Sequence, residues 1–215
     1  MDINDDNNDN NNAVINLIDD DEDDATVDVH PYVRMVPAFD PAVYTFLQAD
    51  LVNYTEGLKI HFFVRGRPTV LARNRYYNGH VVNPAAKRIL EFKRAVQSAM
   101  ELAGVTSPMF PADDVLSVTL VFRMPRPLAD FAGRNRLTGA LVGNNVFAAA
   151  LGDVDNFSKL VLDALNEVLF VDDRQVVVLK AIKTVDDVGL FNGSTELLVR
   201  KIRARDMHLA LANVF

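Results

Sequence analysis

The stretch of sequence that decides the fold covers residues 152–178 and reads GDVDNFSKLVLDALNEVLFVDDRQVVV. Its central part carries apolar residues at helical spacing, which predicts a helix over about residues 156–170. The apolar face of that helix is formed by Phe157, Leu160, Val161, Ala164, Leu165 and Val168. The valine-rich end predicts a strand over residues 175–184. A helix with one apolar face, followed closely by a strand, indicates a helix packed on a sheet.

The sequence on either side of this stretch supplies the remaining elements. Strands are predicted over residues 59–64, 115–122 and 195–202. A further helix begins near Pro84 and is stopped by Gly104. Residues 73–79 are interpreted as a basic, aromatic loop, and residues 126–150 as a long connection rich in Gly, Asn and Ala. This order predicts an α/β (α+β) fold, in which a small mixed sheet packs with two main helices.

The charge of the chain is unevenly distributed. The net charge is −7, but residues 1–30 hold eleven acids and no Lys or Arg, which leaves eighteen acids against 22 bases in the rest. Residues 1–30 are therefore predicted to be a disordered acidic tail. Residues 31–57 are predicted to be a linker or N-terminal extension, residues 58–205 the folded domain, and residues 206–215 a C-terminal tail.

Composition excludes several classes of protein. The chain has no cysteine, so disulfide frameworks, thiolate metal sites and cysteine nucleophiles are excluded. The polar, acidic N-terminus is unlike a secretory signal peptide, and no apolar stretch is long enough to span a membrane. We expect an intracellular protein, with cytoplasm and nucleus both open.

A basic segment indicates a polyanionic partner. Residues 58–94 contain nine bases and one acid. If the partner is DNA, the candidate contacts to its backbone, taken as a patch, are Arg65, Arg67, Arg73, Arg75, Lys87 and Arg88.

Several carboxylates flank the central helix. Asp153 and Asp155 precede it and, in extended chain, point to the same side. By helical spacing, Lys159 and Asp163 fall with Asp155 on the polar face of the helix, and the pair Asp172-Asp173 follows the helix. Crowded carboxylates repel one another unless a cation lies between them, and such oxygen-rich sets suit Mg²⁺ or Mn²⁺. Carboxylate-bound Mg²⁺ is typical of phosphodiester cleavage, in which a lysine can neutralise charge that develops on the phosphate.

Each of these features also has a purely structural interpretation. Asp155 or Asn156 could cap the helix. Lys159 and Asp163 have the spacing of an ordinary ion pair within a helix. Asp172-Asp173 could form a plain turn. It is their occurrence together, beside a basic segment, that favours a site.

The same residues resemble the RusA family of Holliday-junction resolvases. The shared motifs are Asp-x-Asp-Asn-x-x-Lys at residues 153–159, Asp-Ala-Leu at residues 163–165, and Asp-Asp before a Gln-Val strand at residues 172–176. The resemblance implies a small α/β homodimer that binds four-way DNA junctions and nicks two strands symmetrically with a divalent metal, in DNA recombination and repair.

The resemblance also implies roles for individual residues. Asp153, Asp155 and Asp173 match the acidic metal ligands, and Asp172 is a weaker candidate beside them. Lys159 matches the catalytic lysine, and Asp163 is expected to position Lys159 or the helix. The implied cofactor is Mg²⁺, with Mn²⁺ as a substitute, and the implied partners are branched DNA and a second copy of the chain.

Two other classes of function stay open. The first is a non-catalytic relative that binds junction DNA without cutting it. The second is a different metal enzyme, because Asp-x-Asp also occurs in glycosyltransferases and in phosphatases with an aspartyl nucleophile. No glycine-rich phosphate loop is present in the sequence to support the second class.

Overall fold

The computed structural model describes residues 47–72, 75–77, 79–134, 140–143, 152–186, 193–203 and 207, without the side chains of Arg75 and Tyr77. The predicted acidic tail lies outside the described residues, as do most of the predicted linker and most of the C-terminal tail.

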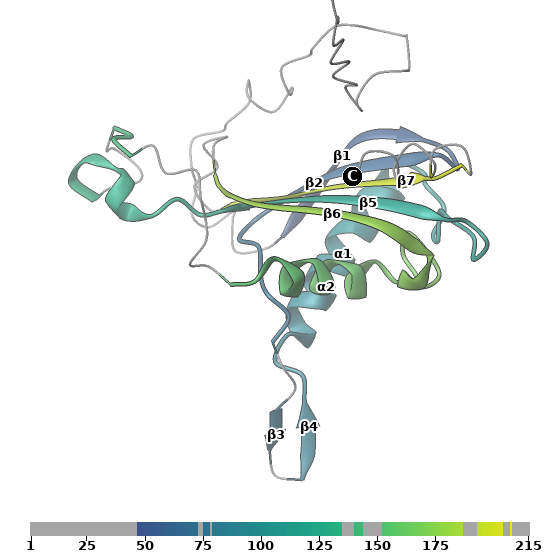
Figure 1. Cartoon of the computed structure of the whole chain (residues 1–215), viewed down its shortest axis with the longest axis horizontal. Helices are drawn as coiled ribbons and strands as arrows, with labels where there is room; N and C mark the ends of the chain where they lie inside the picture. The colour runs from purple at the N-terminus through teal and green to yellow at the C-terminus, as the bar shows by residue number, and fades with distance from the viewer. Residues whose placement is uncertain are drawn as a thin grey trace, which may run out of the picture. The chain divides into compact units, whose positions relative to one another are not determined.

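A five-stranded sheet forms the centre of the fold (Figure 1). Its order is β1-β2-β7-β5-β6, with the bounds β1 Gln48–Thr55, β2 Lys59–Arg65, β5 Leu116–Met124, β6 Val176–Val185 and β7 Ser194–Lys201. Only β5 and β6 are parallel, while the other neighbours pair antiparallel. The mixed sheet predicted from the sequence is confirmed, and β1 and β6 form its edges.

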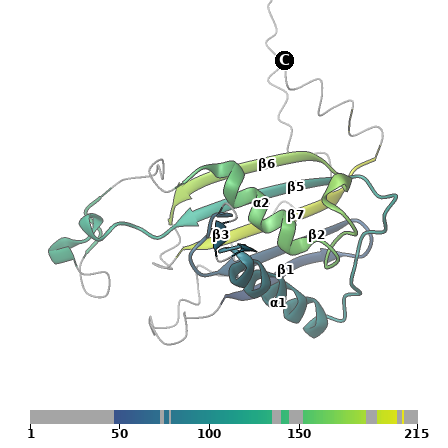
Figure 2. The same ribbon diagram turned by 90° about the horizontal axis from the view of Figure 1, so that it is seen from below.

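Both main helices lie on the same face of this sheet (Figures 1 and 2). Helix α1 covers Ala86–Leu102 and helix α2 covers Val154–Leu165. Their buried residues join those of β2, β5 and β7 in one apolar core, in which Phe62, Phe122 and Phe157 are almost completely buried. The chain leaves α1 through Gly104, whose φ of +68° is a conformation that glycine adopts without strain.

Helix α2 ends earlier than the apolar periodicity predicts. Asn166 already has a non-helical backbone, and Glu167 takes a positive φ of 63°. The amide of Glu167 then donates to the carbonyl of Phe170 at 2.7 Å, closing a tight turn. Val168 and Phe170 are fully buried although they lie outside the helix. The predicted end at residue 170 was wrong because a buried turn continues the apolar pattern.

Three strands were missed. Strand β1 lies within residues 31–57, so the described sheet begins before the predicted boundary at Leu58. The predicted loop at residues 73–79 contains β3 Arg75–Tyr77, which pairs with β4 His80–Val82 in a separate two-stranded sheet.

The predicted long connection at residues 126–150 includes two short 3-10 helices, η3 Leu128–Asp130 and η4 Ala132–Arg134. Over the residues that the structure describes, no helix has the length and apolarity needed to span a membrane.

Candidate active site

The two acids at the start of α2 are exposed. Asp153 is the N-cap residue, has an extended backbone (φ −85°, ψ 138°) and makes no capping hydrogen bond with its side chain. Asp155 lies in the first helical turn. Helix capping by Asp155 or Asn156, the structural interpretation of this motif, is therefore wrong, because the cap position belongs to Asp153. Both carboxylates stand at the positive end of the helix, where the dipole stabilises anions.

Neighbouring segments fix the backbone around these acids. Gly152 has a φ of +93°, and a Cβ atom added there would lie 2.9 Å from Val70. The Lys183 ammonium donates to the carbonyl oxygen of Gly152, and the amide of Leu71 donates to the carbonyl of Asn156 at 3.0 Å. Strand β6 and the segment after β2 thus both hold the start of α2. The positive φ of residue 152 and the close approach of Val70 favour a glycine there.

The polar face of α2 continues the acidic set along the helix. Lys159 is exposed, and Asp163 is partly buried. Burial raises the pKa of Asp163, the charge of Lys159 opposes this rise, and the charge of Asp173 adds to it. Asp163 therefore lies within electrostatic range of both Lys159 and Asp173, at the C-terminal half of the helix.

The two acids after α2 differ in their surroundings. The carboxylate of Asp172 accepts hydrogen bonds from the backbone amide, Nε and Nη2 of Arg174, each at 2.9 Å. These bonds lower the pKa of Asp172 to about 2. Asp172 also caps the 3-10 helix η5, Asp173–Gln175, in a capping box with Gln175. Asp173 is exposed, so it is the available carboxylate of the pair.

The structure places these acids at opposite ends of α2. Strand β6 indicates how far apart the two ends are. Lys183 on this strand contacts Gly152, next to Asp153, whereas Val176 begins the strand directly after the η5 turn that contains Asp173. Along the strand, Lys183 and Val176 are separated by roughly 23 Å at the usual rise per residue. Among the residues that the structure describes, no three Asp, Glu, His or Cys side chains lie close enough to hold a metal ion. The predicted convergence of Asp153, Asp155 and Asp173 is thus not seen within one chain. Their oxygen donors suit Mg²⁺, but their arrangement in one chain does not fit it.

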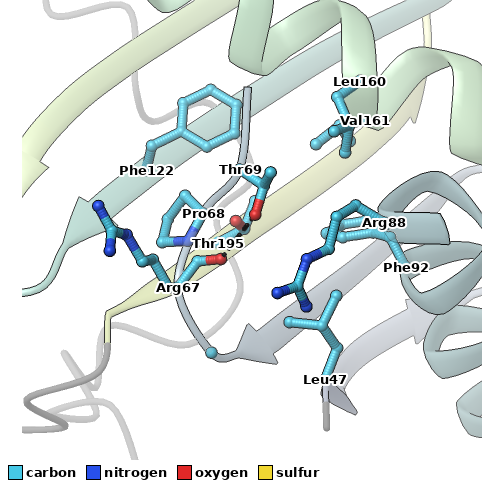
Figure 3. A pocket seen from close by; sticks show the side chains of 11 residues that line it. Leu47, Arg67, Pro68, Thr69, Arg88, Phe92, Phe122, Leu160, Val161 and Thr195 are labelled. Carbon is cyan, nitrogen blue, oxygen red and sulfur yellow. Dashed lines mark hydrogen bonds between the residues drawn. The ribbon is translucent and has the colours of Figure 1, made fainter. Parts of the chain in front are cut away.

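The predicted DNA contacts occupy different environments. Arg67 and Arg88 lie on either side of the segment of Pro68 and Thr69 and line one pocket with Phe122 and Val161 (Figure 3). Arg67 is exposed, whereas Arg88 pairs with Glu91 at 2.7 Å.

The other four members of the predicted patch differ in exposure and in what the structure describes of them. Lys87 is 85% exposed and lies 3.9 Å from the same Glu91. Arg65 pairs with Asp50 at 3.0 Å and is only 20% exposed. The side chains of Arg73 and Arg75 lie outside the described residues.

Gln175 is a structural residue that the sequence analysis did not single out. Its side-chain oxygen accepts from the amides of Val171 and Asp172 at 2.8 and 3.1 Å. Its side-chain nitrogen donates to the carbonyls of Pro111 and Asp114 at 2.6 and 3.1 Å. The side chain thus joins the loop after α2 to the segment before β5. The residue type alone gave no signal of this role.

A charged cluster on the opposite face of the sheet was also missed. Glu196 accepts from His61 at 2.8 Å and pairs with Arg123 at 2.7 Å. The bond with His61 is the largest cause that lowers the pKa of Glu196 to about 2. The three residues of this charged cluster come from three different strands, so no spacing in the sequence could reveal the cluster.

Comparison with known families gives one match. A family model described as Endodeoxyribonuclease RusA matches residues 65–190, which is more than half of the chain. The matched region contains strands β5 and β6, both main helices and every acid of the candidate site. No curated protein matches the sequence.

Proposed function

The chain belongs to the RusA endodeoxyribonuclease family, and on that premise we propose that it resolves four-way (Holliday) DNA junctions by nicking phosphodiester bonds. The observation that carries the proposal is the exposed set of Asp153, Asp155 and Lys159 at the start of α2, on a backbone held by Lys183 and Leu71. A rigid frame for charged groups favours catalysis, because less reorganisation is needed in the transition state.

The proposed roles follow from charge and exposure. Asp153, Asp155 and Asp173 supply the carboxylates of the active site, and Lys159 neutralises negative charge that develops on the phosphate. Asp172 is a weaker candidate, because Arg174 already occupies its carboxylate. Arg67, Lys87 and Arg88 are proposed to contact the DNA backbone, together with Arg73 and Arg75.

The proposal includes Mg²⁺ as the cofactor, with Mn²⁺ as a substitute. The support is chemical, since the candidate donors are carboxylate oxygens and the chain has no cysteine. When bound in such a site, a divalent ion polarises the phosphate and activates water. Because the described residues of one chain do not bring three donors together, the metal requirement rests on the family and on donor type.

A homodimer is part of the same proposal. Symmetric nicking of two strands calls for two active sites related by a two-fold axis. The acids of one chain are divided between the two ends of α2, so a second copy is the natural source of the missing donors at each end. Sedimentation of the full chain should therefore give the mass of a dimer.

The test is a nicking assay on a synthetic four-way junction with Mg²⁺, Mn²⁺ or EDTA. The full chain should cut the junction in a metal-dependent manner. Asp155→Asn should abolish cutting and leave junction binding close to normal, whereas Glu56→Gln, which changes an exposed acid in the turn between β1 and β2, should cut normally. Cutting by Asp155→Asn at the wild-type rate would refute the assignment.

The dispersed acids also favour a second candidate function. A relative that holds junctions without cutting them needs the basic residues but no assembled acidic site. Tight junction binding without nicking in either metal would support this candidate, and would contradict the nuclease proposal.

A further inference from the structure

Strands β3 and β4 form a hairpin that stands apart from the main sheet. Within the part of the chain that the structure describes, the two strands pair only with each other, and Tyr76 lies directly opposite Val81. Tyr76 is 77% exposed and Val81 is 68% exposed. The connecting turn contains Gly79 with a φ of +81°. An aromatic ring and a branched apolar side chain therefore stand together in solvent near the tip of the hairpin.

This apolar pair has no evident role in stabilising the fold. All three residues of β4 are exposed, and neither Tyr76 nor Val81 belongs to the buried core. An isolated two-stranded hairpin is at best marginally stable in water. Large apolar side chains that are gathered on an exposed element usually indicate a binding surface.

The hairpin is attached beside the candidate active site. The segment that leads into it donates from the Leu71 amide to the carbonyl of Asn156, directly after Asp155. In the same segment, Val70 lies against Gly152, directly before Asp153. After β4, Asn83 leads into α1, where its side-chain oxygen accepts from the amide of Ala85 at 2.9 Å. Figure 1 shows the hairpin on the face of the sheet that carries both helices.

Basic residues lie where the chain leaves the hairpin. Lys87 and Arg88 are in the first turn of α1, with side chains 85% and 51% exposed. Cations that flank an exposed aromatic ring are typical of surfaces that bind nucleic acid, in which the cations contact phosphates and the ring stacks on a base.

We propose that Tyr76 and Val81 form a wedge that enters the branch point of a DNA junction and stacks on its exposed bases. The inference rests on the proposed function and adds a specificity-determining element to it. In an open four-way junction the bases at the branch point lack one stacking neighbour, so an inserted side chain disrupts less stacking there than in continuous duplex. The wedge thus discriminates by DNA structure and tolerates any base sequence. Its attachment beside Asp153 and Asp155 places the selected branch point near the acids.

The experiment uses the full chain in EDTA, with junctions that carry 2-aminopurine next to the branch point. The wild-type protein should raise the fluorescence on junction DNA, and should leave the same probe in linear duplex unchanged. Tyr76→Ala should lose this rise and bind the junction about tenfold more weakly, with duplex binding little changed. Tyr76→Phe should retain both properties, because a phenyl ring also stacks. Leu102→Ala removes an apolar side chain of α1 that is 90% exposed and is the matched control.

The outcomes separate the two proposals. If the wild type nicks junctions but Tyr76→Ala keeps the fluorescence rise and the preference for junctions over duplex, the wedge is wrong and the proposed function stands. Equal loss in Tyr76→Phe and Tyr76→Ala would also overturn the wedge, since stacking would not be the cause. If the wild type neither prefers nor nicks junctions, both proposals fail. Circular dichroism of each variant checks that the fold is intact.

Discussion

A pair of aspartates lies at the start of helix α2 and a second pair lies in the segment that follows it, and the surroundings of the two pairs differ. At the N-terminal end, Asp153 and Asp155 are exposed, and their backbone is held by neighbouring segments. At the C-terminal end, Asp172 is bonded to Arg174, whereas Asp173 is exposed. Two neighbouring aspartates in a sequence therefore do not always supply two free carboxylates. Local hydrogen bonds decide which carboxylate oxygens remain available to bind a ligand.

The largest effect expected from the contrast between the two pairs separates the two acids of the C-terminal pair. Asp173→Asn should reduce the nicking rate at least about 100-fold, because it removes a charge proposed to act in the reaction. Asp172→Asn should cause a much smaller loss, because Arg174 already occupies that carboxylate. Single-turnover nicking at saturating enzyme measures both. Equal losses would mean that the contrast between these acids has no functional meaning.

The next effect concerns stability at the hydrogen-bonded end. Gln175→Ala should lower the free energy of unfolding by about 3 kcal/mol, because it removes four hydrogen bonds and leaves backbone groups without partners. Urea denaturation measures the change. Gln97→Ala on α1 is the matched control and should change stability by less than about 0.5 kcal/mol. A stable Gln175→Ala variant would indicate that the loop holds its shape by other means.

A smaller effect tests how the N-terminal end is held. Lys183→Met should reduce the nicking rate about tenfold, because the ammonium no longer positions the carbonyl of Gly152 before Asp153. The affinity for the junction and the thermal stability should stay close to wild type. Lys180→Met, on the same strand, is the control. A loss of affinity in place of rate would indicate that Lys183 contacts DNA and does not position the backbone.

The smallest effect concerns Asp163, between the two ends. Its pKa is raised, so the ionised carboxylate is unfavourable in the folded state, and the folded protein gains stability as the carboxyl is protonated. Asp163→Asn should therefore stabilise the protein at pH 7, by less than about 0.5 kcal/mol. The difference should vanish below the ordinary pKa of 3.8, where wild-type Asp163 is neutral in both states. A gain that persists unchanged at low pH would exclude this cause.

Most of the fold could be predicted from the periodicity of apolar residues in the sequence. This periodicity is clearest in elements that bury one side. Strand β5 alternates fully between buried and half-buried residues and was predicted. Strand β1 was missed, because it is an edge strand with Asp50 and Asn53 among its residues and a register shift between Leu51 and Asn53. Strands β3 and β4 were missed although Asn78-Gly79, between them in the sequence, is a common hairpin signal.

The candidate site was predictable only where its residues are local. Helical spacing alone placed Asp155, Lys159 and Asp163 on one face of the helix. The distance between Asp153 and Asp173 depends on the path of the chain between them. Helix α2 has 12 residues and spans roughly 18 Å, so acids that flank it in sequence are separated in space. Closeness along the sequence therefore suggested a cluster that one chain does not form.

The edge strand β6 has a consequence for the solubility of the protein. It is ten residues long, and Val177, Leu179 and Ile182 are each close to half exposed. An edge of this kind offers unpaired backbone groups and apolar side chains to any other extended chain. Lys180 and Lys183 interrupt the apolar run and add positive charge, which repels identical strands. Acetylation of these two lysines, or salt high enough to screen them, removes that repulsion and favours aggregation through β6.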